Sequence, residues 1–462
     1  MEQFETVLGG VADFIWGWPL LVLLFGTHLY LTVRLRFVQR YIPEAIKLSF
    51  STKREGAGDV SQFGALMTAL AATIGTGNIV GVATAVAAGG PGAVLWMWLT
   101  GVFGISTKFS EAVLAVKYRV TTKNGTMAGG PMYAIERGMG LKWLAVLFAV
   151  FTAIAAFGIG NMAQANSAAT LLNQTCSIPL WASGCVMTAI TALVILGGIK
   201  SIAKTCEILV PFMAIFYILG CAVLLAMKYD TLGQTVMLIF QSAFTGQAAA
   251  GGFAGAAMKE AARYGIARGL FSNESGLGSA PIVAAAAQTP DPVKQALVSS
   301  TGTFWDTVVV CAMTGLVVVN SGMWQDGHNG AMLTKAAFGT LPVVGSIVLT
   351  VGLSTFVFST ILGWSYYGEK AVEYLLGSWA ILYYRLLWVA AVMVGSVVSL
   401  KIVWTFSDIA NALMALPNLV SLLVLTPVII AETRKHLWDR TKDDRDGKGE
   451  AVEEPADVVS GT

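Results

Sequence analysis

Long apolar runs recur along the chain and alternate with short polar segments. Each run is close to the roughly 20 residues that an α-helix needs to cross the hydrocarbon core of a membrane. The pattern predicts eleven transmembrane helices, at residues 14–33, 63–88, 92–117, 143–172, 180–198, 206–227, 233–262, 295–320, 343–372, 381–400 and 407–430. The expected fold class is therefore an all-α integral membrane protein.

Two of these runs contain glycine-rich polar interruptions. One is the sequence Gly-Thr-Gly-Asn at 75–78, and the other extends over 244–255. Irregular backbone at membrane depth is tolerated only where protein or a wet cavity satisfies the freed amide and carbonyl groups. The alternative is that the glycines only let helices pack closely, but close packing does not account for Asn78, whose amide needs partners of its own.

The two interruptions occupy corresponding positions if the first helix is set aside and the other ten are divided into two groups of five. Paired interruptions of this kind indicate a binding site near the middle of the membrane in transporters built from inverted repeats. The predicted organisation is an N-terminal helix with a basic loop (1–61), two five-helix repeats (62–228 and 229–431) and a charged cytoplasmic tail expected to be disordered (432–462).

Composition and charge agree with a membrane protein. Of the 462 residues, 55% are hydrophobic and only 12% are charged, against about 25% charged residues in soluble domains. Basic residues gather in alternate loops, notably at 34–54 and 434–448, so the positive-inside rule predicts an external N-terminus and a cytoplasmic C-terminus. The net charge of +2 gives no reason to expect nucleic acid, and no obligate protein partner is evident.

Other function classes lack their characteristic residues in this sequence. The five cysteines show no metal-binding spacing, and no cluster of His, acidic and nucleophilic residues suggests a membrane enzyme. The repeated filter of a channel and the phosphate-binding loop of an ATP-driven pump are also missing. We therefore expect a protein that is not an enzyme.

Three longer motifs resemble those of a known family. They are Gly-Gly-Pro-Gly-Ala-Val-Leu-Trp-Met-Trp at 89–98, Gly-Gly-Pro-Met-Tyr at 129–133 and Ser-Asn-Glu-Ser-Gly-Leu-Gly-Ser-Ala-Pro at 272–281. Together they resemble the sodium:alanine (alanine or glycine:cation) symporter family. The resemblance implies a leucine-transporter fold with one extra N-terminal helix. It also implies sodium-coupled uptake of alanine, glycine or a similar small neutral amino acid across a prokaryotic plasma membrane. A proton-coupled carrier or an exchanger on the same fold is the alternative.

A zwitterionic amino acid needs donors for its carboxylate, acceptors for its ammonium group and a wall that limits its side chain. Amides at 75–77 begin the outer half-helix, where the helix dipole favours a carboxylate, and carbonyls at 72–73 and 244–246 are candidates for the ammonium group. Gln164 is expected as a polar contact, and Trp364 and Phe244 as walls, with ordinary packing as the alternative for Trp364. The expected substrate contacts are Thr73, Gly75, Thr76, Gly77, Asn78, Gln164, Phe244, Thr245, Gly246, Thr360 and Trp364.

The local pattern Gly-x-Gly-Asn is similar to that of sodium-coupled amino-acid transporters with this fold. Carried over by position, it implies that sodium, the co-transported ion, is held by the carbonyls of Ala71 and Ile74. The hydroxyls of Ser359 and Thr360 are the expected further ligands. Hard oxygen ligands without a full set of carboxylates suit a monovalent ion. The alternative is that these hydroxyls bond only to carbonyls of their own helix.

Three charged residues inside predicted helices require separate interpretation, because a buried charge in a membrane is costly and usually functional. Lys108 and Glu111 lie three residues apart and are expected to pair on one helix face. Asp306 has no obvious local partner in the sequence. It is a candidate for coupling or gating through cation binding, and a conformational ion pair is an equal alternative.

Overall fold

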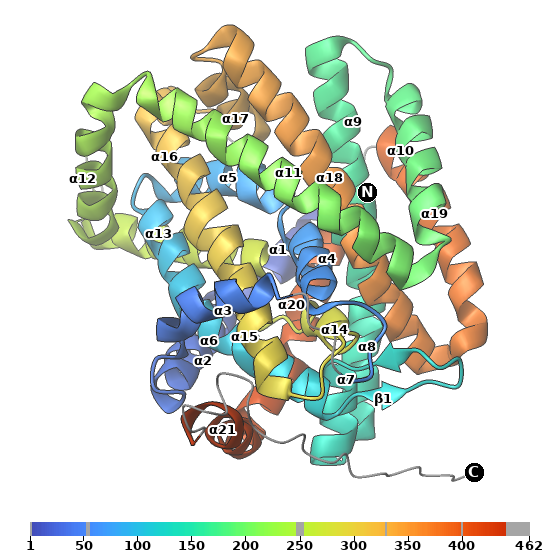
Figure 1. The fold of residues 1–462 in the computed structure, drawn as a ribbon. Coiled ribbons are helices and arrows are strands. Elements are labelled where there is room, and N and C mark those ends of the chain that lie inside the picture. The colour runs from blue at the N-terminus through green and yellow to red at the C-terminus, as the bar shows by residue number, and fades with distance from the viewer. Residues whose placement is uncertain (1, 52–55, 246–253, 329, 399–400, 440–462) are drawn as a thin grey trace.

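The computed structural model describes residues 2–51, 56–245, 254–328, 330–398 and 401–439, and these are predominantly helical (Figure 1). The elements up to residue 228 are α1 (Glu2–Ile15), α2 (Trp18–Arg34), η1 (Val38–Tyr41), α3 (Ile42–Ser49), α4 (Gln62–Thr73), η2 (Gly77–Gly81), α5 (Val82–Gly89), α6 (Ala93–Lys117), β1 (Val120–Thr121), β2 (Met127–Ala128), α7 (Pro131–Tyr133), η3 (Ala134–Gly138), α8 (Lys142–Phe157), η4 (Gly158–Met162), α9 (Ala163–Cys176), α10 (Leu180–Ile195) and α11 (Gly198–Ala226). The elements after residue 228 are α12 (Tyr229–Thr245), α13 (Ala254–Asn273), α14 (Pro281–Ala284), α15 (Pro292–Thr303), η5 (Phe304–Cys311), α16 (Ala312–Ser321), η6 (Met323–Asp326), α17 (Gly330–Phe338), α18 (Pro342–Leu376), η7 (Ser378–Ala380), α19 (Ile381–Val397), α20 (Lys401–Val424), α21 (Thr426–Thr433) and η8 (Arg434–Trp438).

Helices of membrane-spanning length account for most of the predicted runs. Within the described residues, eight helical segments are long and apolar enough to cross a membrane, and the bent pair formed by α4 and η2–α5 would be a ninth. The predicted run at 180–198 is the shorter apolar helix α10. The run at 233–262 corresponds to α12 and α13, which lie on either side of residues 246–253, outside the described part. The all-α membrane fold is confirmed, and the count of eleven spans stays a prediction.

The N-terminal span begins earlier than its apolar run suggests. It extends over Val7–Arg34 and is interrupted between α1 and α2 at Gly17, where a Cβ would lie 2.7 Å from the carbonyl oxygen of Phe14. Pro19 stands in the first turn of α2, where its missing amide costs no helical hydrogen bond. The interruption therefore follows from Gly17 and Pro19. A prediction based only on the length of apolar runs does not take these residues into account.

Helix α18, with 35 residues, is the longest helix in the described part of the chain, and it packs against α4, α8, α9 and α11. It lies close to α4 at Gly363, where a Cβ would lie only 2.6 Å from the amide nitrogen of Ala72. A glycine at this point removes the side chain that would otherwise separate the two backbones. The contact places the preceding turn of α18, with Ser359 and Thr360, beside the C-terminal end of α4.

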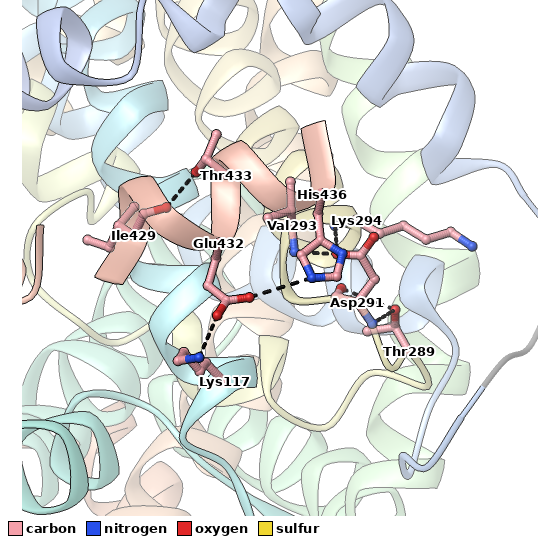
Figure 2. A network of polar contacts seen from close by, with 9 residues as sticks. All are labelled: Lys117, Thr289, Asp291, Val293, Lys294, Ile429, Glu432, Thr433 and His436. Atoms are coloured by element: carbon pink, nitrogen blue, oxygen red, sulfur yellow. Dashed lines mark hydrogen bonds and ion pairs between the residues drawn. The ribbon is translucent and has the colours of Figure 1, made fainter. Parts of the chain in front are cut away.

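The chain after residue 431 is not wholly a disordered tail, which corrects the boundary predicted at 432. The helical structure continues through η8 to Trp438, and Figure 2 shows its polar contacts with α6 and with the start of α15. Glu432 pairs with Lys117 at 2.5 Å and with His436 at 3.6 Å. The ring of His436 also lies 3.4 Å from Asp291 Oδ1. Residues 440–462 lie outside the described part.

The aspartate of this network also begins a helix. Asp291 Oδ1 accepts hydrogen bonds from Val293 N at 2.8 Å and Lys294 N at 3.2 Å, which makes Asp291 the N-cap of α15. In Figure 1 the hairpin strand β1, α7 and α21 lie at the lower end of the molecule. This is the end for which the basic loops predict the cytoplasm, and the sidedness itself stays a prediction.

We expect Gly363→Ala to weaken the packing of α18 on α4. The added Cβ overlaps the backbone of Ala72, and overpacking of this kind destabilises by about 1–3 kcal/mol. Thermal unfolding of the purified protein in detergent measures the effect. Gly26→Ala in α2 is the matched control, because a Cβ there meets nothing within 4 Å. Equal unfolding temperatures for the two variants would contradict this account.

Candidate functional site

The centre of the site is the interruption between α4 and η2. Helix α4 ends at Thr73 and the next helical segment starts at Gly77. The helix axis bends by 52° at this break. Ile74 between them is extended, with ψ of 94°. At Gly75 a Cβ would lie 2.5 Å from Thr360 Oγ1. The glycine therefore allows α18 to approach the broken backbone directly.

Asn78 holds the broken turn in place. Its Oδ1 accepts a hydrogen bond from Gly75 N at 2.8 Å, and its Nδ2 donates to Asp306 Oδ1 at 2.6 Å. The other carboxylate oxygen of Asp306 accepts from Ser272 Oγ at 3.0 Å and from Thr307 Oγ1 at 2.6 Å. A buried carboxylate with neutral donors on both oxygens thus ties η5 and the end of α13 to the break.

A small cavity lies beside the break. Only about 20 Å³ of it is open to the centre of a water molecule, which is room for about one water. An amino acid could enter only if the walls moved apart. The lining residues are Ala72, Thr73, Gly75, Thr76, Gly77, Ile159, Gln164, Phe271, Glu274, Thr360, Trp364 and Asn411.

Gln164 forms a polar wall of this cavity and Trp364 forms an aromatic wall. Gln164 Nε2 donates to Thr76 Oγ1 at 3.2 Å and to Ile159 O at 2.9 Å, and its Oε1 lies 3.4 Å from Thr76 N. The indole of Trp364 packs over Gly160, where a Cβ would lie 2.5 Å from the ring. The polar wall therefore touches the broken turn, and the aromatic wall depends on a glycine behind it.

Four oxygens converge at the side of the break that faces α18. Ser359 Oγ lies 3.2 Å from Ala71 O and 3.4 Å from Ile74 O, and Thr360 Oγ1 lies 3.3 Å from Ile74 O. Both hydroxyls are closer to Phe356 O of their own helix, at 2.8 and 2.9 Å. A hydroxyl has one proton, so donation to Phe356 leaves lone pairs of the four oxygens facing one another.

Lone pairs that face one another repel unless a cation lies between them, so the four oxygens remain the candidate site for the predicted sodium ion. Separations of 3.2–3.4 Å are those of neighbouring oxygen ligands around a hard cation that binds at about 2.4 Å. The ligands are neutral, which suits a monovalent ion. Within the described residues, no group of three or more His, Cys, Asp or Glu could hold a metal ion.

The structure brings most of the predicted site residues together and separates a few of them. Phe244 is 57% exposed and its ring packs on Trp96 at 6.0 Å. Phe271, rather than Phe244, lines the cavity together with Trp364. Thr245 ends α12, but its side chain and all of Gly246 lie outside the described part. The predicted amide donor Gly75 N is already engaged by Asn78.

Asn78 and Asp306 lie outside the cavity lining, and their predicted parts in substrate binding and in coupling or gating stay predictions. The carboxylate of Asp306 accepts hydrogen bonds from the neutral side chains of Asn78, Ser272 and Thr307. The expected pairing of Lys108 with Glu111 is not formed. Glu111 Oε1 instead accepts from Asn418 Nδ2 at 2.7 Å and from two backbone amides of the loop after α13, at 3.0 Å each. These contacts connect distant helices, so sequence spacing alone does not predict them.

Four lining residues were not predicted: Ile159, Phe271, Glu274 and Asn411. Glu274 had a visible signal, because it lies in the motif at 272–281 and is an acidic residue within an apolar region. Asn411 is one of several polar residues in α20, which also contains Ser407, Asp408 and Asn418, and no local pattern singles it out. Ile159 and Phe271 are apolar residues among many, and only the packing of their helices selects them.

A second, larger cavity lies at the C-terminal end of α18 and has charged walls. About 570 Å³ is open to the centre of a water molecule. Arg385 of α19 donates to both carboxylate oxygens of Glu369 at 2.7 and 2.9 Å. Asp59 accepts from Met127 N at 2.8 Å, and burial raises the pKa of its carboxyl group. These contacts join α18 to α19 and the segment before α4 to the hairpin.

Comparisons with known proteins cover nearly the whole chain. Residues 1–450 match the sodium:alanine symporter family. The chain is 51% identical over 443 residues to the sodium/alanine symporter AgcS of Methanococcus maripaludis, covering 94% of this chain and 97% of that protein. It is 52% identical over 437 residues to an uncharacterized transporter of Haemophilus influenzae, covering 94% and 96% of the two chains.

The fold is also that of solved transporters. The crystal structure of MhsT in complex with L-phenylalanine superposes with a TM-score of 0.57 at 14% identity, covering 82% of this chain and 98% of that one. An identity this low supports the fold alone. The leucine-transporter-like fold implied by the motifs is confirmed, and family and fold are both those of transporters.

We expect Asn78→Ala to destabilise the protein and to abolish transport. The substitution leaves Gly75 N and Asp306 Oδ1 without the hydrogen bonds that they form with Asn78, and each unsatisfied buried group costs about 1–3 kcal/mol or more. Thermal unfolding in detergent and substrate uptake into proteoliposomes measure the two effects. Asn173→Ala is the control, because that amide is exposed and bonds only to Ile178 O. An unchanged unfolding temperature for Asn78→Ala would refute the bridging role.

Proposed function

We propose that this chain, which belongs to the sodium:alanine symporter family, takes up a small neutral amino acid together with sodium. Membership of the family makes it a cation-coupled amino-acid transporter of the membrane. The finer proposal names sodium as the ion and alanine or glycine as the substrate. It also places the protein in the plasma membrane of a prokaryote, with the N-terminus outside and the C-terminus in the cytoplasm.

The observation that carries the proposal is the convergence of Ala71 O, Ile74 O and the hydroxyls of Ser359 and Thr360. Four neutral oxygens select a weakly held monovalent cation over a divalent one. The name of the relative from Methanococcus maripaludis, a sodium/alanine symporter, supports the same ion and substrate.

Coupling between ion and substrate has a direct physical basis in shared residues. Thr360 contributes its hydroxyl to the oxygen cluster and also lines the small cavity. Ile74 and Gly75 are consecutive in the broken turn, and one faces the ion cluster while the other faces the cavity. A cation that holds α18 against the turn therefore stabilises the cavity wall, and binding of the substrate favours binding of the ion reciprocally.

The small size of the cavity favours a small substrate. Trp364, Phe271 and Ile159 occupy its apolar side, and a substrate whose side chain is a hydrogen or a methyl group requires the smallest displacement of these walls. The remaining contacts proposed for the substrate are Thr73, Thr76, Gly77 and Gln164. Transport by alternating access requires no covalent chemistry, so we propose no enzymatic activity.

A proton-coupled carrier on the same fold is the competing function. Asp306 and Glu274 are buried carboxylates near the break and would be the groups to bind a proton. Replacement of sodium by choline at constant pH separates the two possibilities. Uptake of alanine that continues unchanged in choline would exclude sodium coupling.

We expect Ser359→Ala and Thr360→Ala to raise the sodium concentration for half-maximal alanine uptake by about 10-fold or more. Each substitution removes one oxygen from the cluster, and a polar contact to a charged group contributes about 1.5–3 kcal/mol. The measurement is radiolabelled alanine and glycine uptake into proteoliposomes over a range of external sodium.

Thr355→Ala is the matched control for these two variants. Thr355 is a threonine of the same helix whose hydroxyl bonds only to Val351 O at 2.8 Å and Gly352 O at 3.0 Å. Its removal should leave the sodium dependence unchanged. If all three variants show the same sodium dependence as the wild type, the oxygen cluster is not the ion site.

A further inference from the structure

Two polar side chains in the wall of the small cavity have no role in the oxygen cluster or in the broken turn. They are Glu274, which follows α13, and Asn411 in the middle of α20. Glu274 is 4% exposed and Asn411 is 1% exposed. A charge and an amide buried at this depth are expensive to keep and are usually functional.

Glu274 presents a carboxylate to the cavity. Its Oε1 accepts a hydrogen bond from Trp364 Nε1 at 2.9 Å, and its Oε2 accepts from Ser279 Oγ at 2.5 Å. Both donors are neutral, and a carboxylate can accept about four hydrogen bonds. These two bonds therefore bring no positive charge to Glu274 and leave it with free acceptor positions. The ammonium group of Lys108 interacts with it electrostatically.

The backbone at Glu274 is also unusual. Its φ is +56°, in the left-handed region that few residues other than glycine adopt. Its amide bonds to Leu270 O at 3.0 Å and closes the last turn of α13. Strained backbone of this kind is concentrated at binding sites, and here it accompanies a side chain that lines the cavity.

Asn411 has unused hydrogen-bonding capacity on both atoms of its amide. In the described part of the chain, neither Oδ1 nor Nδ2 has a hydrogen-bond partner. Buried amides are nearly always satisfied in native proteins. An amide that lines a cavity and bonds to nothing in the surrounding protein is best explained by a ligand that supplies the partner.

We propose that Glu274 and Asn411 form the subsite that binds the ammonium group of the transported amino acid. An ammonium group carries three donors and one positive charge, which match the free positions of the Glu274 carboxylate and the unpaired Oδ1 of Asn411. Trp364, bonded to Glu274, is thereby held over the cavity next to the same substrate. The inference rests on the proposed function, because it assumes that the substrate is an amino acid.

This subsite replaces the predicted acceptors in the second break. Phe244 does not line the cavity and Gly246 is outside the described part, whereas Glu274 and Asn411 line the cavity directly. A carboxylate in this position would favour amino acids over carboxylic acids of the same shape. L-lactate, in which a hydroxyl stands in place of the ammonium group, should be bound much more weakly than L-alanine.

The test uses the full-length protein, purified in detergent with sodium present, and measures the affinities for L-alanine and L-lactate by calorimetry. We expect Glu274→Gln to weaken alanine binding about 10- to 100-fold and to reduce the preference for alanine over lactate by a similar factor. If Glu274→Gln lowers the affinities for alanine and lactate by the same factor, the substitution acts through the shape of the cavity and the assignment is overturned.

Asn411→Leu gives a second test, in which thermal stability and alanine binding are expected to change differently. Replacing an unsatisfied buried amide with an apolar side chain of similar size should leave the unfolding temperature without alanine unchanged or higher. Alanine binding should nevertheless weaken by about 10-fold. If Asn411→Leu lowers the unfolding temperature and alanine binding stays at the wild-type level, Asn411 is structural and the proposal is wrong.

Glu111→Gln is the matched control, since Glu111 is another buried carboxylate that contacts the loop after Glu274. It does not line the cavity, so its substitution should lower thermal stability and leave alanine affinity unchanged. Wild-type alanine affinity in both Glu274→Gln and Asn411→Leu overturns the subsite alone. A wild-type protein that binds neither alanine nor glycine with sodium overturns the proposed function, and the subsite with it.

Discussion

The structure depends on one constraint: backbone groups freed inside a membrane must find partners within the protein. The turn between α4 and η2 meets this requirement with its own Asn78 and with side chains from other helices. Asn78 accepts from the amide of Gly75, and Gln164 lies against the amide of Thr76. The carbonyls of Ala71 and Ile74 face the hydroxyls of α18. Gln164 belongs to α9 and the hydroxyls to α18, and Asn78 is itself bonded to Asp306 of η5, so the break depends on the assembled bundle.

Close packing through glycines determines how wide the site is. Gly363 lets the backbones of α18 and α4 come into contact. Gly75 allows Thr360 to approach the broken turn, and Gly160 leaves space for the indole of Trp364. Small residues are the usual means by which membrane helices approach one another, since lipid provides no hydrophobic force between them. The same contacts leave a cavity with room for about one water. An amino acid that enters must therefore move helices, as alternating access requires.

Three buried carboxylates illustrate how a membrane protein uses expensive charges. Glu111 holds the loop after α13 through two backbone amides, and Asp306 holds the broken turn through Asn78. Only Glu274 lines the cavity. All three would look alike in the sequence, as acidic residues in apolar surroundings. Their different roles follow from the donors that the fold places around each one.

The apolar runs, the glycine interruption at 75–78 and three motifs were enough to predict the fold class, the family and the position of the break, because these properties are local or repeat along the chain. Ser359 and Thr360 were predicted beside Ala71 and Ile74 through resemblance of a short pattern, and the structure brings them within 3.2–3.4 Å. Sequence reasoning placed Phe244 in the cavity and paired Lys108 with Glu111. It missed Glu274 and Asn411 and ended the ordered chain near residue 432. Those outcomes depend on which helix faces which, and contacts between residues separated by a hundred or more positions are decided only when the whole bundle packs.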